Sequence, residues 1–77
     1  MKRLTVYSRP QCHLCELVLE ELLQVAGGQA EVRVVDIDTD PVLQERYWLR
    51  IPVVVGLDGE LSEYPLDRNA VMAYLAA

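Results

Sequence analysis

The order in which β-rich and helical segments alternate limits the fold of this chain more than any other feature of its sequence. A short β-rich run at residues 4–7 is followed by an amphipathic stretch at 12–25, a Gly-Gly pair at 27–28, and a second β-rich run at 32–37. Glycine takes the left-handed conformation that ends many helices. Two strands joined through a helix form a parallel pair with a right-handed crossover. The first half of the chain therefore predicts a βαβ unit.

Apolar residues in the stretch 12–25 recur at helical spacing. The residues expected to form its buried stripe are Leu14, Leu17, Val18, Leu22 and Val25. Glu16, Glu20 and Gln24 lie on another face. The run at 32–37 is mostly apolar, so we expect that strand to be covered on both faces.

The second half predicts a short helix and then a hairpin. Asp40-Pro41 is a helix start, because a carboxylate caps free N–H groups and proline is tolerated at the first helical position. That helix must end before Pro52, and a third strand begins at 53–55. Asp58-Gly59 between apolar neighbours predicts a type I′ turn, so the third and fourth strands should be antiparallel.

A last helix completes the predicted order. Pro65 is expected to close the fourth strand, and Asp67 can cap the helix. Its buried stripe should contain Ala70, Val71, Tyr74 and Leu75. The order βαβαββα predicts an α/β fold with a four-stranded mixed sheet and helices on both faces, the smallest arrangement that buries these stripes.

Composition predicts one compact acidic domain spanning residues 1–77, because 52% of the chain is hydrophobic and 12 acidic residues against 7 basic ones give a net charge of −5. Arginines scattered singly form no patch for phosphates, so we expect no nucleic-acid partner. Apolar runs fall far short of the roughly 18 residues that span a bilayer, so we expect no membrane association. Thr5 and Ser8 interrupt any signal-peptide core, and we expect a cytoplasmic protein.

The chain has two cysteines, Cys12 and Cys15, which follow a predicted strand and begin a predicted helix. Unpaired N–H groups and the helix dipole stabilise a thiolate there, so Cys12 should be the attacking sulfur. Cys15, one turn further on, can resolve a mixed disulfide. The alternative is a pair of small buried residues with coincidental spacing. A zinc site is less favoured, because with His13 the chain offers at most three ligands where zinc takes about four.

Two polar features leave less specific signals. His13 lies between the cysteines, where an imidazole can stabilise a thiolate or simply be exposed, and the sequence leaves both interpretations open. Asp36, Asp38 and Asp40 resemble the opening of a calcium loop, but a proline falls where that loop needs glycine. A strand end and a helix cap explain these carboxylates, and no metal site is predicted.

Two segments resemble glutaredoxins of the thioredoxin superfamily. The first is Tyr7-Ser8-Arg9-Pro10-Gln11-Cys12-His13-Leu14-Cys15, which looks like their active-site segment, and the second is Arg50-Ile51-Pro52-Val53-Val54, which resembles their proline loop. The order βαβαββα is that of the thioredoxin-like fold. The resemblance therefore extends over essentially the whole chain.

The resemblance implies a role for individual residues. Cys12 would be the nucleophile and Cys15 the resolving thiol. Pro52 would be a cis-proline whose neighbour Ile51 offers backbone hydrogen bonds to a bound thiol substrate. Arg9 matches a basic residue that meets a glutathione carboxylate in that family.

The sequence also departs from the family. His13-Leu14 stands where glutaredoxins usually have proline and an aromatic residue, and Tyr64-Pro65-Leu66-Asp67 replaces a Gly-Gly-x-Asp element that holds glutathione. We therefore expect glutathione to bind weakly. Small redoxins that serve ribonucleotide reductase and accept electrons from thioredoxin reductase are also similar, and the sequence does not separate the two branches.

The sequence predicts a small dithiol–disulfide oxidoreductase that transfers electrons without a bound cofactor. Its expected partners are a disulfide-containing protein or small thiol substrate and a thiol reductase system, and the chain is expected to be monomeric. Glutathione remains a possible reductant. The alternative is a glutaredoxin-like binding module that holds an iron–sulfur cluster across a dimer or acts as a redox-inert adaptor.

Overall fold

A computed structural model describes all residues 1–77 and contains the predicted order of strands and helices. The elements are β1 (Lys2–Ser8), α1 (His13–Ala26), β2 (Ala30–Asp36), a 3-10 turn η1 (Ile37–Thr39), α2 (Pro41–Tyr47), β3 (Val53–Gly56), β4 (Gly59–Ser62) and α3 (Arg68–Ala76). The turn η1 was not predicted. The βαβαββα order is confirmed.

The four strands form one mixed sheet in the order β2-β1-β3-β4. β1 and β2 are parallel, in a register that runs from Lys2 opposite Ala30 to Ser8 opposite Asp36. β3 is antiparallel to both β1 and β4. Because β1 lies inside the sheet, the loop that leaves its carboxyl end starts from a central position.

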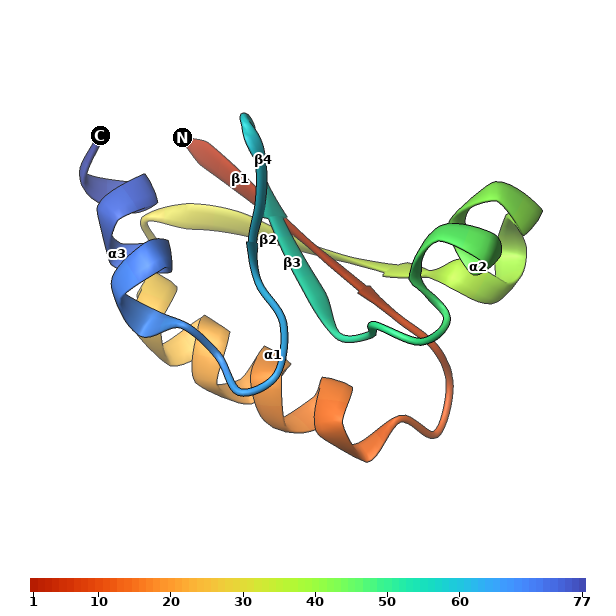
Figure 1. The fold of residues 1–77 in the computed structure, drawn as a ribbon. Helices are drawn as coiled ribbons and strands as arrows, with labels where there is room; N and C mark the ends of the chain where they lie inside the picture. The colour runs from red at the N-terminus through yellow and green to blue at the C-terminus, as the bar shows by residue number, and fades with distance from the viewer.

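Helices cover both faces of the sheet, as predicted. α1 and α3 lie together on one face, and α2 lies on the other, beyond the carboxyl end of β2 (Figure 1). The cluster under α1 and α3 contains Leu4, Val6, Val18, Leu22, Ala26, Val54 and Val71. The cluster under α2 contains Ile37, Tyr47 and Val53. Both chain termini lie at one end of the molecule, and the β1–α1 loop lies at the opposite end (Figure 1).

The predicted helix boundaries are confirmed by their caps. Gly27 has a φ of 53° and donates its N–H to the Leu23 carbonyl, which ends α1. Asp40 accepts from the N–H of Val42 at 2.9 Å, and Asp67 accepts from the N–H of Ala70 at 3.0 Å. Each carboxylate satisfies a backbone donor that the helix itself leaves unpaired.

Two expectations about burial were wrong. β2 is an edge strand and Val34 is 49% exposed, because the other side of β1 pairs with β3. In α1, Leu14 and Leu17 are 42% and 41% exposed. The buried line of α1 consists of Cys15, Val18, Leu22 and Ala26, so the packed face is rotated relative to the predicted stripe. Cys15 is an apolar member of this face that a count of aliphatic residues overlooks.

The β3–β4 hairpin forms, but its turn begins one residue earlier than predicted. Gly56 pairs with Gly59, so Leu57 and Asp58 are the turn residues, and only Gly59 has a positive φ. Tyr74 explains this position: its hydroxyl accepts from the N–H of Leu57 at 3.1 Å, and its ring covers Gly56, where a Cβ would lie 2.7 Å from the ring. β4 ends at Ser62, before Pro65.

Candidate functional site

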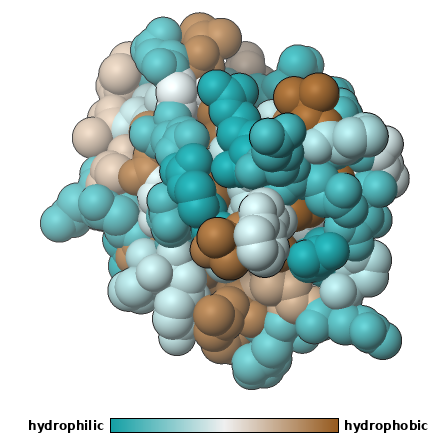
Figure 2. Space-filling view, turned by 45° about the vertical axis from the view of Figure 1, so that its right-hand side comes forward, coloured by the Kyte–Doolittle hydropathy of each residue, from teal (hydrophilic) through white to brown (hydrophobic).

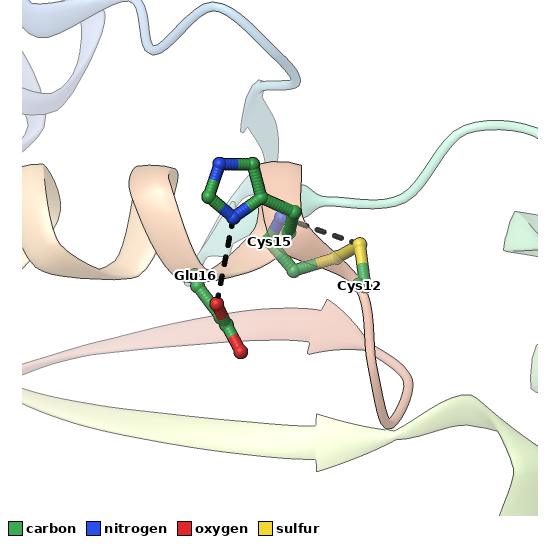
Figure 3. The surroundings of a disulfide bond; sticks show 4 residues. Cys12, Cys15 and Glu16 are labelled. Atoms are coloured by element: carbon green, nitrogen blue, oxygen red, sulfur yellow. Dashed lines mark hydrogen bonds and ion pairs between the residues drawn. A yellow bond between two sulfur atoms is a disulfide. The ribbon is translucent and has the colours of Figure 1, made fainter.

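Cys12 and Cys15 lie where α1 begins, and their sulfurs are joined in a disulfide (Figure 3). Cys12 is the N-cap residue of α1 and has extended backbone angles. Its Sγ accepts a hydrogen bond from the N–H of Cys15 at 3.2 Å. The Cα atoms of the pair are 5.2 Å apart. A backbone donor is therefore directed at the Cys12 sulfur, as expected for a sulfur at a helix N-terminus.

The two sulfurs differ in their access to solvent. Cys15 is 4% exposed and belongs to the packed face of α1, whereas Cys12 is half-buried. Gln11 immediately precedes the pair and is the only non-glycine residue with a positive φ, at 63°. This left-handed residue turns the chain from the loop into α1. This conformation was not predicted, because glutamine has no particular preference for it.

The proline loop reaches the sheet beside this site. Tyr7, near the end of β1, is the partner of Val53, the first residue of β3. The segment before Val53 therefore adjoins the end of β1, from which the cysteine loop departs. The Ile51–Pro52 peptide is cis, as the resemblance implied, and Pro52 is buried. The Tyr64–Pro65 peptide is also cis, which was not predicted.

Ile51 has one of its two backbone groups already engaged. Its N–H donates to the carbonyl of Tyr47 at 3.0 Å. The resemblance implied that the backbone of Ile51 binds substrate, and this hydrogen bond leaves its carbonyl oxygen for that purpose. A substrate thiol or amide that approached the loop would therefore meet an acceptor and not a donor.

Arg9, in the loop between β1 and α1, forms an ion pair with an acidic residue of η1. Its Nη2 donates to Asp38 Oδ1 at 2.8 Å, and Gln44 Nε2 donates to the same oxygen at 3.1 Å. The hydrogen bond from Gln44, followed by the hydrogen bond and charge of Arg9, lowers the pKa of the Asp38 carboxyl. The predicted partner of a glutathione carboxylate is thus already paired with a carboxylate of the chain.

His13 forms no hydrogen bond with either sulfur. It is exposed, and its Nδ1 lies 3.7 Å from Glu16 Oε2 (Figure 3). This geometry favours the interpretation of His13 as an exposed polar residue over a role in thiolate stabilisation. Three of the predicted binding residues thus already have partners within the chain: Arg9 is paired with Asp38, His13 lies near Glu16, and the N–H of Ile51 donates to Tyr47.

Arg50 ties the proline loop to the β4 hairpin. Its guanidinium donates to Glu63 Oε2 at 2.9 Å and forms a further ion pair with Glu60. These hydrogen bonds raise the pKa of Arg50 and lower that of Glu60. The guanidinium also lies over the ring of Tyr47, 5.6 Å from its centroid.

Tyr47 in turn stacks on Tyr7, with ring centroids 4.5 Å apart. This stack supports the end of β1 from which the cysteine loop departs. The stack of Tyr47 on Tyr7 was not predicted, because Tyr7 lies in another element. No local pattern in the sequence indicates such a pair.

The surroundings of the cysteines form no deep small-molecule pocket. The cavity that both cysteines line measures about 180 Å³, below the roughly 300 Å³ at which ligand pockets usually begin. The face seen when the right-hand side of Figure 1 is turned forward is mostly hydrophilic with separate apolar patches (Figure 2). Trp48 and Leu49, just before the proline loop, are 54% and 76% exposed. The site is therefore open to a large partner.

The structure contains neither a candidate metal-binding cluster nor a candidate membrane-spanning helix. No three His, Cys, Asp or Glu side chains lie close enough together to hold a metal ion. None of the helices combines the length and apolar character needed to cross a membrane.

Comparisons with known proteins agree with this geometry. The sequence matches the model of the Glutaredoxin-like domain (DUF836) over residues 3–76. Target protein XcR50 from X. campestris is 37% identical, with a TM-score of 0.74, over 96% of this chain and 97% of that one. Protein Ne2328 from Nitrosomonas europaea is 34% identical, with a TM-score of 0.84, over 95% of this chain and 89% of that one.

A more distant likeness concerns the fold alone. Thioredoxin 1 from Thermosipho africanus is 15% identical, with a TM-score of 0.63, over 96% of this chain and 94% of that one. A search among curated proteins gives no match. The expected thioredoxin-like fold is confirmed.

Proposed function

The chain belongs to the glutaredoxin-like domain family, and from this premise we propose that it is a small dithiol–disulfide oxidoreductase. One observation carries the proposal: the disulfide of Cys12 and Cys15 lies at the N-terminus of α1, where the Cys15 N–H points at the Cys12 sulfur. When the pair is reduced, that donor and the helix dipole favour a thiolate on Cys12.

The reaction needs only the two cysteines and a substrate disulfide. The Cys12 thiolate attacks one sulfur of the substrate, forms a mixed disulfide and releases the other substrate sulfur as a thiolate. Cys15 then loses its proton and attacks the Cys12 sulfur, which closes the internal disulfide and releases the second substrate thiolate. Two electrons pass to the substrate, whose thiolates take up protons from water. A thiol reductant returns the pair to its dithiol form.

The difference in burial between the two cysteines supports different roles for them. A nucleophile must reach a sulfur on another molecule, and Cys12 is the more accessible of the pair. Cys15, at 4% exposure, can attack only a disulfide already formed at Cys12. The attacking sulfur is therefore Cys12, and Cys15 is the resolving thiol.

Protein disulfides suit this site better than glutathione. Arg9 is paired with Asp38, and the Ile51 N–H is occupied by Tyr47, so two of the groups that would hold the tripeptide are engaged. Each missing charge-assisted hydrogen bond lowers affinity by about tenfold or more. The natural reductant is accordingly a protein thiol reductase, in a reducing compartment such as the cytoplasm.

A coupled assay tests this proposal. The reduced protein is mixed with hydroxyethyl disulfide, and NADPH consumption is followed with either thioredoxin reductase or glutathione and its reductase as the electron source. We expect turnover with the former that disappears in Cys12→Ser. Turnover that persists in Cys12→Ser contradicts the proposal, and so does wild-type protein that is inactive with both electron sources.

Visible absorbance distinguishes the proposed dithiol oxidoreductase from the alternative, a protein that binds an iron–sulfur cluster. Freshly purified anaerobic protein should show no visible absorbance, since the dithiol mechanism uses no cluster. A visible chromophore that is lost in Cys12→Ser supports the cluster-binding alternative instead.

A further inference from the structure

A groove lined by both apolar and acidic side chains lies along α1, on the C-terminal side of the cysteine pair. About 350 Å³ in volume, it is lined by Leu17, Val18, Glu20, Glu21, Gln24, Tyr64, Pro65 and Leu66. Val18 is fully buried and forms part of its floor. Leu17 and Tyr64 are 41% and 48% exposed, so apolar side chains remain available at its edges. These residues border a groove that no segment of the chain fills.

Exposed apolar surface of α1 extends from the groove toward the reactive sulfurs. Leu14, within the C-x-x-C pair, is 42% exposed and lies three residues before Leu17, so the two leucines share one side of α1. Leu17 follows Cys12 by five helical residues, which corresponds to about 8 Å along the axis. An extended peptide spans that distance in about two to three residues. A partner bound at Cys12 therefore reaches the groove with the residues next to its own cysteine.

The rim of the groove is acidic. Glu20 and Glu21 line the groove, and α1 has no lysine or arginine. Glu21 already forms an ion pair with Arg68, whose Nη1 lies 3.2 Å from Glu21 Oε2. Glu20 has no ion-pair or hydrogen-bond partner and is exposed, so its charge is available to a binding partner.

We propose that this groove is a docking site for a protein substrate that carries an apolar residue flanked by lysine or arginine close to its reactive disulfide. The proposal rests on the proposed oxidoreductase function and names the class of substrate for that site. The apolar lining takes the apolar residue, and Glu20 attracts the basic flank. A second copy of this chain fits less well, because it would bring another acidic α1 against the first and its net charge is −5.

Three probes test the substrate preference. Two synthetic peptides carry a cysteine as a mixed disulfide with a chromophoric thiol and a leucine three residues away, flanked by lysines in one peptide and by glutamates in the other. Hydroxyethyl disulfide is the small neutral probe. For each variant, kcat/KM with a peptide is divided by kcat/KM with hydroxyethyl disulfide, so that changes at the cysteines cancel. Wild-type protein should favour the basic peptide over the acidic one by about tenfold at low ionic strength.

Two substitutions in the groove should change this preference in different ways. Leu17→Ser should lower the normalised rate with both peptides by about threefold to tenfold, because the buried leucine of the peptide loses its contact. Glu20→Lys should instead reverse the preference between basic and acidic peptides. The matched controls are Leu23→Ser, also on α1 and 53% exposed, and Asp58→Lys, in the hairpin turn. Neither control should alter the normalised rates by more than about twofold.

The outcomes separate this inference from the proposed function. Wild-type protein that reduces hydroxyethyl disulfide but shows no preference between the peptides overturns the docking site alone. Equal effects of Leu17→Ser and Leu23→Ser, or of Glu20→Lys and Asp58→Lys, also overturn it. Wild-type protein that fails with hydroxyethyl disulfide refutes the oxidoreductase function on which the docking site depends.

Discussion

The two faces of the sheet are packed to very different depths. Under α1 and α3, 7 buried residues drawn from both helices and from β1 and β3 form a continuous cluster. Under α2, the buried cluster has 3 members, Ile37, Tyr47 and Val53. The cysteine helix belongs to the first face, and the proline loop follows the helix of the second.

This difference suggests that one face of the sheet supplies most of the stability and the other can change its conformation more easily. The helix that presents Cys12 and Cys15 is fixed by deep packing, with Leu22 fully buried at its centre. The proline loop depends instead on a tyrosine stack and on the exposed ion pairs of Arg50. Regions with few buried contacts open at lower free-energy cost. The α2 face should therefore be the part of the site that adapts to a partner.

The largest expected effect comes from a substitution in the deeper cluster. Leu22→Ala should lower the free energy of unfolding by about 2–5 kcal/mol, through lost apolar burial and the cavity left behind. The neighbouring Leu23→Ala, 53% exposed, should cost less than about 0.5 kcal/mol. Urea unfolding of the oxidised proteins measures both. Equal losses would show that α1 does not pack through the face described.

A substitution in the smaller cluster under α2 should lower stability less than Leu22→Ala does, but should weaken substrate binding more. Tyr47→Leu keeps an apolar side chain but removes the stack on Tyr7, worth about 0.5–1.5 kcal/mol, and the ring beneath Arg50. We expect a smaller loss of stability than for Leu22→Ala and a clear rise in KM for a disulfide peptide. If Tyr47→Leu destabilises the protein as much as Leu22→Ala, the contrast between the faces is wrong.

Asp38 should control the access of anions to Arg9. Asp38→Asn removes the carboxylate that pairs with Arg9, so glutathione should bind about threefold to tenfold more tightly. Titration of the Cys15→Ser variant, with and without Asp38→Asn, measures the change. Asp58→Asn supplies a control with the same loss of charge elsewhere. An unchanged affinity would mean that Arg9 does not face the bound tripeptide.

The smallest effect is expected for Arg50→Gln. Its ion pairs with Glu60 and Glu63 are exposed and should contribute less than about 1 kcal/mol to stability. Because Arg50 lowers the pKa of Glu60, this contribution is present at neutral pH. It is lost as the pH falls through that lowered pKa, below the usual carboxyl range. Wild type and Arg50→Gln should therefore converge in stability in acid, and a constant difference at all pH values would contradict this assignment.

Local chemistry explains what the sequence could predict. The ends of the helices were predicted correctly because each cap forms its hydrogen bond with a residue only a few positions away. This holds for Gly27, Asp40 and Asp67. The βαβ and hairpin connections followed from the order of the elements. The positions of Cys12 and Cys15 at the start of α1 followed for the same reason.

The features that were not predicted depend on residues that lie far apart in the chain. Arg9 and Asp38 are 29 residues apart, and their ion pair exists only because β1 and β2 are parallel neighbours. The exposure of Val34 follows from the strand order, which places β2 at the edge. Tyr74 shifts the hairpin turn through a contact with Leu57 that no local pattern indicates.

The central claim is that Cys12 attacks and Cys15 resolves, and trapping of the mixed disulfide tests it most directly. Reduced Cys15→Ser and Cys12→Ser proteins are each incubated with the basic disulfide peptide, and the products are measured by intact-protein mass spectrometry. We predict that Cys15→Ser accumulates a stable adduct of one peptide on Cys12, whereas Cys12→Ser gives little adduct in the same time. Faster adduct formation on Cys15 in the Cys12→Ser protein would contradict the account.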